Sequence, residues 1–272
     1  MIPRCRLLAL SLAIAGLSVF ASTAAATPWI NPSTGNPYHW ARTANPFTVK
    51  LGSDVTGAWT TYLNGVSGGW SKYGTLTDYI GTFTTTNPLR TTVVTGLTTG
   101  RKCRATKGRV EVCDATYGNN GWLGLASIWV SGDHITQGTV KLNDFYYSSG
   151  SFYDTPIWRG AVTCQEVGHT FGLDHQDTSG ANFHTCMDYA NTPDAWNTHP
   201  DRYDYSTLVD DYAHLDSTNT IAAATTTSGR RGLHRVRDDL YVENLGGDNR
   251  RFVWVVWADR SASHSAPDEA DD

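Results

Sequence analysis

Residues 155–175, TPIWRGAVTCQEVGHTFGLDH, hold most of the specific chemistry of the chain and decide its expected fold. Thr155 is a residue type that caps helix N-termini, and Pro156 suits the first helical position, where its missing N–H would have no partner anyway. The helix is expected to run through His169 until Gly172, which lets the chain turn sharply. The stretch therefore predicts one helix followed by a tight return.

Five residues of this stretch follow the pattern Q-E-x-x-H-x-x-G-x-x-H, namely Gln165, Glu166, His169, Gly172 and His175. On a helix Gln165 and His169 lie one turn apart, so both side chains can reach one ion, while Glu166 projects from an adjacent face. His175 can return after the turn as a third ligand. Three ligands and an open position suit a hydrolytic zinc, which acidifies a water whose proton the carboxylate takes. A single histidine is more often a plain surface or core residue, but the set in register favours the metal site.

Met187 follows in the run TCMDYA (residues 185–190), and with it the stretch resembles the zinc signature of the metzincin metalloproteases. That signature has His where this chain has Gln165. The combination is similar to that of a secreted, matrixin-like bacterial group with Gln at this position. The resemblance covers residues 47–216. It implies an α+β fold with a twisted mixed sheet of about five strands, an active-site helix, a further packing helix and a C-terminal helix.

The resemblance also implies roles for individual side chains. His169 and His175 would bind zinc, Glu166 would be the general base, and Met187 would lie beneath the metal. Tyr189 matches a Met-x-Tyr turn whose tyrosine contacts the metal or steadies the oxyanion; a plain core tyrosine is the alternative. The implied function is a secreted metalloendopeptidase that hydrolyses peptide bonds by a Glu-activated, metal-bound water.

Gln165 is the departure from the family pattern, because an amide oxygen is a weaker zinc donor than imidazole. Three outcomes are open: Gln165 ligates zinc with lower affinity, a water or another side chain such as His184 completes the shell, or the site has lost zinc and activity. The first is favoured because Glu166 is retained, and a structural metal site needs no base. The alternative function is a catalytically inactive protein of metzincin fold that binds peptides or polymers through the cleft.

Substrate pairing is expected on the strand LGLASIWV at residues 123–130. In metzincins the edge strand before the active-site helix pairs with the substrate backbone. Gly124, Leu125 and Ala126 are therefore candidates for holding a peptide by β-addition. An ordinary buried strand is the alternative. The expected partner is a protein or peptide substrate.

Residues 1–26 are typical of a secretory signal, because Arg4 and Arg6 precede an apolar run and small residues offer a cleavage site. No later segment reaches transmembrane length, so a membrane anchor is not expected. Loss of these two arginines takes the formal charge from −5 to about −7. Nucleic acid is not an expected partner, since phosphate binding needs concentrated positive charge. The mature protein is expected to be an extracellular monomer.

Four cysteines remain after removal of the signal, and an even number in an exported chain implies disulfides, with three possible pairings. Cys103 with Cys113 is favoured because the two flank a hairpin-like stretch. Cys164 with Cys186 is favoured because this bond would tie the Q-E-x-x-H segment to the residue before Met187. A metal site of four cysteines is not favoured, because no C-x-x-C pair exists.

Further elements are predicted on the N-terminal side of the motif. Residues 27–46 form an irregular arm, and FTVKLGSDV at 47–55 alternates like a strand. An apolar stripe from Trp59 to Trp70 predicts a helix that packs on a sheet. Segments rich in β-branched and aromatic residues between 80 and 145 predict a run of strands.

The C-terminal side is expected to be simpler. Tyr205 to Leu215 carries the apolar stripe of a last helix, with Asp204 placed to cap it. Residues 217–250 are predicted to be a linker of low complexity. Residues 251–272 are predicted to be a strand-like segment followed by an acidic tail.

The remaining histidines show no ligand spacing. His134 can be drawn into a structural metal site with Asp133, but an ordinary loop histidine is the favoured interpretation. The same interpretation applies to four others: His39, His199, His214 and His234. Zinc is the expected cofactor, and a structural calcium ion is considered beside it without assigned ligands.

Overall fold

The computed structural model describes the chain except for the expected signal sequence (residues 1–26), part of the expected linker (222–231) and most of the expected acidic tail (259–266 and 268–272). The predictions for these segments lie outside the described residues. None of the described helices is long and apolar enough to cross a membrane.

The described residues form eleven strands, three α-helices and one short 3₁₀ helix. In chain order they are β1 (His39–Trp40), β2 (Phe47–Asp54), α1 (Gly57–Trp70), β3 (Gly74–Thr77), β4 (Thr82–Thr85), β5 (Leu89–Thr95), β6 (Arg109–Ala115), β7 (Trp122–Ser131), β8 (His134–Asn143), α2 (Pro156–His169), η1 (Ala195–Thr198), α3 (Arg202–Asp211), β9 (His234–Arg237), β10 (Leu240–Gly246) and β11 (Asn249–Trp257).

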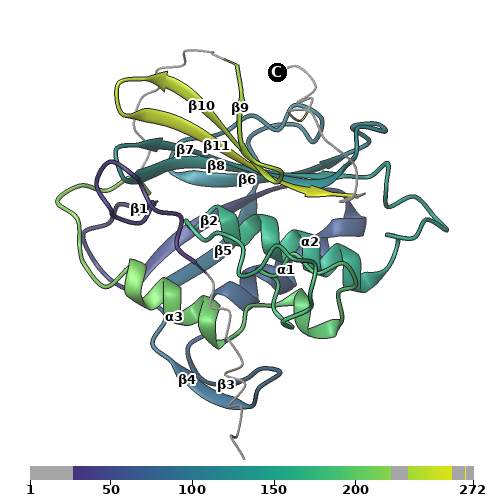
Figure 1. Cartoon of the computed structure of the whole chain (residues 1–272), viewed down its shortest axis with the longest axis horizontal. Helices are drawn as coiled ribbons and strands as arrows, with labels where there is room; N and C mark the ends of the chain where they lie inside the picture. The colour runs from purple at the N-terminus through teal and green to yellow at the C-terminus, as the bar shows by residue number, and fades with distance from the viewer. Residues whose placement is uncertain (1–26, 222–231, 259–266, 268–272) are drawn as a thin grey trace, which may run out of the picture.

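Nine of these strands form one mixed sheet in the order β5-β2-β6-β8-β7-β11-β10-β9, with β1 paired to β8. The half from β5 to β8 is parallel, and the half from β8 to β9 is antiparallel. The fold is therefore α+β, but the expected sheet of about five strands is too small. The C-terminal strands β9, β10 and β11 extend the sheet beyond β7, while β3 and β4 pair with each other outside it (Figure 1).

Helices α1 and α2 pack on one face of this sheet (Figure 1). The apolar stripe of α1 is buried as predicted, with Trp59, Leu63, Val66 and Trp70 at most 3% exposed. Burial of each such side chain contributes about 1.5–3 kcal/mol of transfer free energy, so this stripe anchors the helix to the sheet.

Helix α2 begins and ends as the sequence predicts. The hydroxyl of Thr155 accepts a hydrogen bond from the Trp158 N–H at 3.2 Å, and Pro156 is the first helical residue. Beyond the other end, Gly172 has φ +94°, and a Cβ there would lie 1.9 Å from the carbonyl oxygen of Tyr38. Only glycine fits this turn, because the left-handed conformation and the close approach both exclude a side chain.

Helix α3 begins earlier than predicted, because Asp201 and not Asp204 is its cap. The Asp201 carboxylate accepts hydrogen bonds from the N–H groups of Tyr203 and Asp204, while Asp204 Oδ2 accepts from the Asp201 N–H at 2.9 Å. This reciprocal pairing satisfies amide groups of the first turn that would otherwise have no partner. Asp204 is therefore a residue inside the helix.

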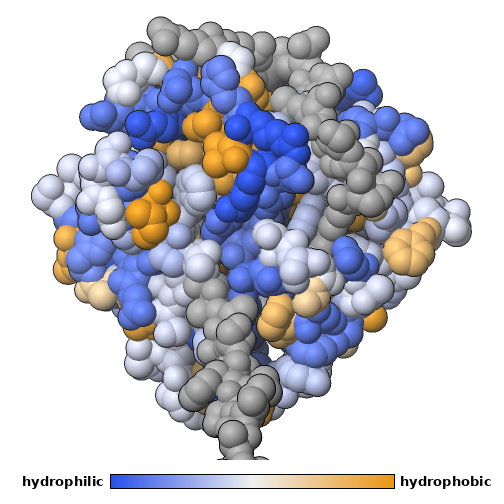
Figure 2. Space-filling model, in the orientation of Figure 1, coloured by the Kyte–Doolittle hydropathy of each residue, from blue (hydrophilic) through white to orange (hydrophobic). Residues whose placement is uncertain are grey.

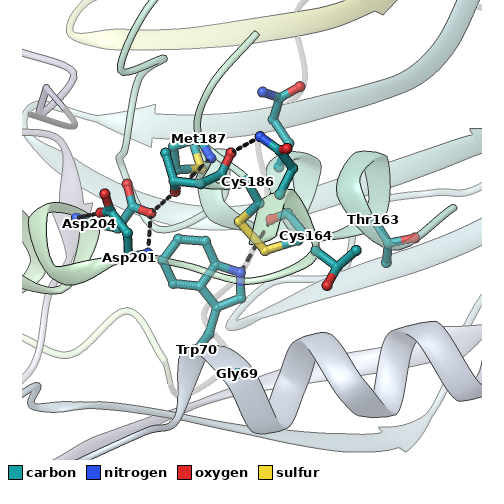
Figure 3. Close-up of a disulfide and its surroundings, with 12 residues drawn as sticks. Gly69, Trp70, Thr163, Cys164, Cys186, Met187, Asp201 and Asp204 are labelled. Carbon is teal, nitrogen blue, oxygen red and sulfur yellow. Dashed lines mark hydrogen bonds between the residues drawn. A yellow bond between two sulfur atoms is a disulfide. The ribbon is translucent and has the colours of Figure 1, made fainter. Parts of the chain in front are cut away.

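Both predicted disulfides are present. One joins Cys103, in the loop before β6, to Cys113 in β6. The other joins Cys164 in α2 to Cys186 in the loop after α2, and the indole N–H of Trp70 donates to the carbonyl of Cys164 (Figure 3). Two disulfides in a chain of this size fit an oxidising compartment.

The C-terminal residues belong to the main sheet. Strands β9 and β10 lie within residues 217–250, which were expected to be a linker, and the predicted final strand is β11. Both faces of β11 are apolar: Trp254 and Val256 join the main core, and Val253 and Val255 join a second apolar cluster. A strand with two apolar faces is stable where both faces are shielded from water. The position of β11 between β7 and β10, covered by the two clusters, meets this need.

The outer surface contrasts with this core. On the face shown in Figure 2, apolar residues lie in small separate groups among hydrophilic ones. Scattered apolar side chains are ordinary on a surface that meets water.

Candidate active site

His169, the last residue of α2, faces His175, which follows the turn after the helix. Their Nε2 atoms lie 3.1 Å apart, and both residues are at most 5% exposed. Nδ1 of His169 lies 2.9 Å from the carbonyl oxygen of Leu173, and Nδ1 of His175 lies 2.6 Å from the Asp239 carboxylate. An imidazole whose Nδ1–H is held by an oxygen presents the lone pair of Nε2, as metal-binding histidines do. The two Nε2 atoms are therefore placed to share one cation.

The surroundings of His169 favour its neutral form. Burial, and then the neighbouring His175, lower the pKa of His169 to about 3. The Trp254 ring stacks on the imidazole, with ring centroids 5.0 Å apart and planes 11° from parallel. Since a neutral imidazole is the form that binds a metal, this burial does not oppose ligation.

Glu166 lies on α2 one turn before His169 and is fully buried. Neither carboxyl oxygen has a hydrogen-bond partner of ordinary geometry among the described residues. Burial raises the pKa of Glu166 well above its usual range, and the backbone groups of Val256 and Ala126 offset only part of this rise. Burial of a carboxyl with only these backbone contacts costs stability. Such a carboxyl is more readily explained by chemistry than by packing.

Gln165 is 4% exposed, and its amide N–H donates to the carbonyl oxygen of Asp188 at 2.9 Å. This bond fixes the nitrogen end of the amide, so the oxygen is the end left for a cation or a water. His184, the alternative third ligand, is engaged elsewhere: its Nδ1 lies 2.6 Å from Asp194, and its ring stacks on Tyr79.

The loop after α2 brings Met187 and Tyr189 under and beside the helix. Met187 is fully buried. The ring of Tyr189 lies next to His175, with centroids 4.9 Å apart. Its hydroxyl donates to the carbonyl oxygen of Val255 at 3.1 Å and accepts from the Trp257 N–H at 2.8 Å. Tyr189 therefore connects the histidine pair to β11.

Strand β11 occupies the side of β7 that was expected to take a peptide. It runs antiparallel to β7, with residues 254–256 opposite residues 124–126 in reverse order. A Cβ at Gly124 would lie 2.8 Å from Glu166 Oε1, so glycine is needed for β7 to pass this carboxyl. Among the described strands, those at the two ends of the sheet are β5 and β9. The candidates Gly124, Leu125 and Ala126 thus pair with the chain's own C-terminal strand.

The peptide group between Val255 and Val256 lies between two predicted catalytic residues. Its carbonyl oxygen accepts the hydrogen bond from Tyr189, and its N–H approaches the Glu166 carboxyl. The side chain of Val256 forms part of the wall of a cavity between α2 and the loop after it, which also includes Gln165. This cavity has a volume of about 10 Å³, room for at most one water.

Charged groups next to the histidines come partly from β9 and from the turn between β9 and β10. Arg237 of β9 pairs with Asp174 and with Asp239, its Nε lying 2.7 Å from Asp239 Oδ1. Burial alone would raise the pKa of both carboxyls, but contacts with Arg237 and His175 lower it. The indole N–H of Trp254 also donates to Asp174 at 3.1 Å. The roles of Asp239, Arg237 and Trp254 could not be predicted, because no spacing rule connects the C-terminal residues to the motif.

A second cluster of metal-binding residue types lies outside this site. The ligand atoms of His39, His214 and Asp216 all lie within 4.8 Å of one another, so this group could hold a metal ion. The sequence assigned these histidines no role, since 175 residues separate His39 from His214.

No protein-family model, no curated protein and no solved structure matches the chain. The chemistry assigned to the main site therefore rests on its geometry. A phenol and a buried carboxyl flank one backbone peptide group, and the phenol ring lies next to one of two imidazoles that face each other. Such a set can bind a divalent cation and can move a proton to or from a peptide nitrogen.

Proposed function

We propose that the protein is a secreted zinc-dependent endopeptidase. The observation that supports this most is the histidine pair, with Nε2 atoms 3.1 Å apart and both Nδ1 atoms next to oxygens. The fully buried carboxyl of Glu166, one turn away on α2, is the second support. His169 and His175 would hold the metal, and the oxygen of Gln165 is proposed as the third ligand. The donor set fits zinc with one position open.

Zinc at this site would act as a Lewis acid and would lower the pKa of a water. Glu166 takes the proton from the attacking water and passes it to the nitrogen of the leaving amine. The hydroxyl of Tyr189 donates to the carbonyl oxygen of the bond that is cleaved, as it does to Val255 in the structure.

The proposed substrate is a protein or peptide, because β7 pairs with an antiparallel strand directly beside Glu166. Export is proposed from the signal-like N-terminus, and the two disulfides fit it.

The test is the isosteric change Glu166→Gln, with casein as substrate and zinc supplied. Cleavage is expected to fall by about 10²-fold or more, because the general base is removed while the shape of the site is kept. Zinc bound at the histidine pair should stay in this variant and be lost in His169→Ala. A Glu166→Gln variant as active as wild type would exclude the proposal, and so would a zinc-loaded protein that leaves casein intact both with β11 in place and with β11 displaced from β7.

A peptide-binding protein without activity is the second candidate. The observation that favours it is the departure at Gln165, whose amide nitrogen is held by Asp188. Such a protein would bind its peptide equally well with and without a chelator, whereas the endopeptidase should be inactivated by the chelator and restored by zinc.

A further inference from the structure

We propose that His39, His214 and Asp216 form a second zinc site, separate from the histidine pair beside α2. His39 lies in β1, at the N-terminal edge of the fold, whereas His214 and Asp216 follow α3. The site would therefore join two parts of the chain that no disulfide connects.

The distances between the three ligand atoms match a zinc shell. Nε2 of His39 lies 3.1 Å from Nε2 of His214 and 3.3 Å from Oδ1 of Asp216, and His214 Nε2 lies 3.5 Å from the same oxygen. Around tetrahedral zinc with bonds of about 2.0–2.1 Å, neighbouring ligand atoms are separated by about 3.3–3.4 Å. The triangle thus has the size of one face of a zinc tetrahedron without rearrangement.

Two of the three ligands, His39 and Asp216, are oriented by contacts outside the triangle. Nδ1 of His39 lies 2.8 Å from the carbonyl oxygen of Pro37, so its Nε2 turns a lone pair inward. Oδ2 of Asp216 is taken by the Arg42 guanidinium at 2.8 Å, which leaves Oδ1 for the cluster. Lone pairs of two ring nitrogens and a carboxylate oxygen so close together repel one another, and a cation among them would replace this repulsion by attraction.

The fourth position is open. His134 Nε2 lies 3.3 Å from Asp216 Oδ1 but does not belong to the mutually close group. The His214 side chain is 47% exposed, so water can reach the ion from this side. A shell of two nitrogens and one oxygen suits zinc better than calcium, which prefers oxygen ligands only.

The test measures metal binding in His169→Ala, a background that disables the other site. The protein is stripped with a chelator, dialysed against zinc and analysed for metal content and thermal stability. One zinc per chain and a higher melting temperature with zinc are expected. Adding His214→Ala should remove both, while His199→Ala, which changes an exposed histidine outside both sites, should change neither.

His214→Ala is chosen because this side chain is half exposed, so the metal-free protein should melt as its parent does. Equal zinc content and an equal zinc-dependent rise in melting temperature with and without His214→Ala would overturn the second site. Absence of zinc from the His169→Ala protein would overturn it as well.

Strand β11 carries a separate inference, which rests on the proposed function. We infer that residues 254–257 lie in the cleft as a bound substrate would, so that the protein blocks its own cleft. The strand makes the antiparallel pairing with β7 that a peptide would need. The peptide group between Val255 and Val256 is where a cleaved bond would lie, since Tyr189 holds its carbonyl and Glu166 faces its N–H.

Side chains strengthen this placement. The Trp254 ring stacks on His169, and Val256 is part of the wall of the small cavity beside Gln165. The hairpin of β10 and β11 is held in place by contacts between the preceding strand β9 and the site. One of these contacts is the ion pair of Arg237 with Asp174. A free peptide can enter only if β11 leaves, so binding should be limited by displacement of the strand.

The test is Val256→Asp, which places a charge in the apolar core at the wall of the small cavity beside Gln165 and should expel the strand. Val256→Ile is the control, because it keeps the side chain apolar. Both are made in the Glu166→Gln background, and binding of a fluorescent peptide with the sequence of residues 250–258 is followed by anisotropy. Affinity is expected to rise at least about tenfold, or 1.4 kcal/mol, with Val256→Asp and to stay unchanged with Val256→Ile.

A milder change guards against misfolding of the charged variant. Arg237→Ala loosens the hairpin without touching β11 and should raise peptide affinity in the same direction. Equal peptide affinity in the Glu166→Gln parent, in Val256→Asp and in Arg237→Ala would overturn self-blocking. Binding that rises without any cleavage when Glu166 is restored would leave the blocked cleft standing and would exclude the endopeptidase.

Discussion

Gln165 holds Asp188 through its amide nitrogen, and this contact decides which of its atoms can meet a cation. The side chain is buried one turn before His169, where an imidazole would be the stronger donor. The chain thus combines a well-oriented histidine pair with a weak third donor. Zinc affinity at this site should therefore be limited by this one residue.

Gln165→His is expected to strengthen zinc binding at least about tenfold, or 1.4 kcal/mol, because a third imidazole replaces the amide. The affinity is measured by competition with a chromogenic chelator, in proteins that carry His214→Ala so that the other cluster does not contribute. Gln165→Ala is the control and should bind zinc more weakly than the parent. An unchanged affinity in both variants would show that residue 165 does not ligate.

Residues of the motif could be predicted because their relations are local. Glu166 and His169 share one helix, and Gly172 returns His175 to it, so spacing alone sets their geometry. Asp239, which lies against His175, is brought there by the pairing of distant strands. No pattern within a short window reports a contact of that kind.

The same distinction holds for whole elements. Helices α1 and α2 were predicted because each has a full apolar stripe or a cap with a physical signature. Strand β10 could not be predicted because polar residues such as Glu243 and Asn244 interrupt its apolar pattern. Its partner β11 supplies most of the apolar surface of the pair. The place of β11 in the sheet could not be predicted, since strand order depends on long-range pairing and not on composition.

Across the whole molecule, several buried carboxyls bind protons more tightly than they would in the unfolded chain. Burial raises the pKa of Asp144 and Asp201 to about 6 and that of Asp211 to about 7, from 3.8. Such groups stabilise the fold fully below the unfolded pKa, and this contribution is lost as the pH rises through the folded pKa. Carboxyls with a lowered pKa, such as Asp174 and Asp239, contribute fully above about pH 4. They therefore do not affect the pH dependence of stability above this pH.

The free energy of unfolding should therefore decrease between about pH 5 and pH 7, and Asp211→Asn should remove part of the decrease. Asp211 is 5% exposed at the end of α3, and its Oδ2 has no hydrogen-bond partner among the described residues. The variant should gain about 2–3 kcal/mol relative to wild type between these pH values, as urea denaturation at each pH would show. Asp210→Asn, at the exposed neighbour on the same helix, should leave most of the slope. Parallel stability curves for wild type and Asp211→Asn would contradict the assignment, because the buried carboxyl would then titrate alike in the folded and unfolded chain.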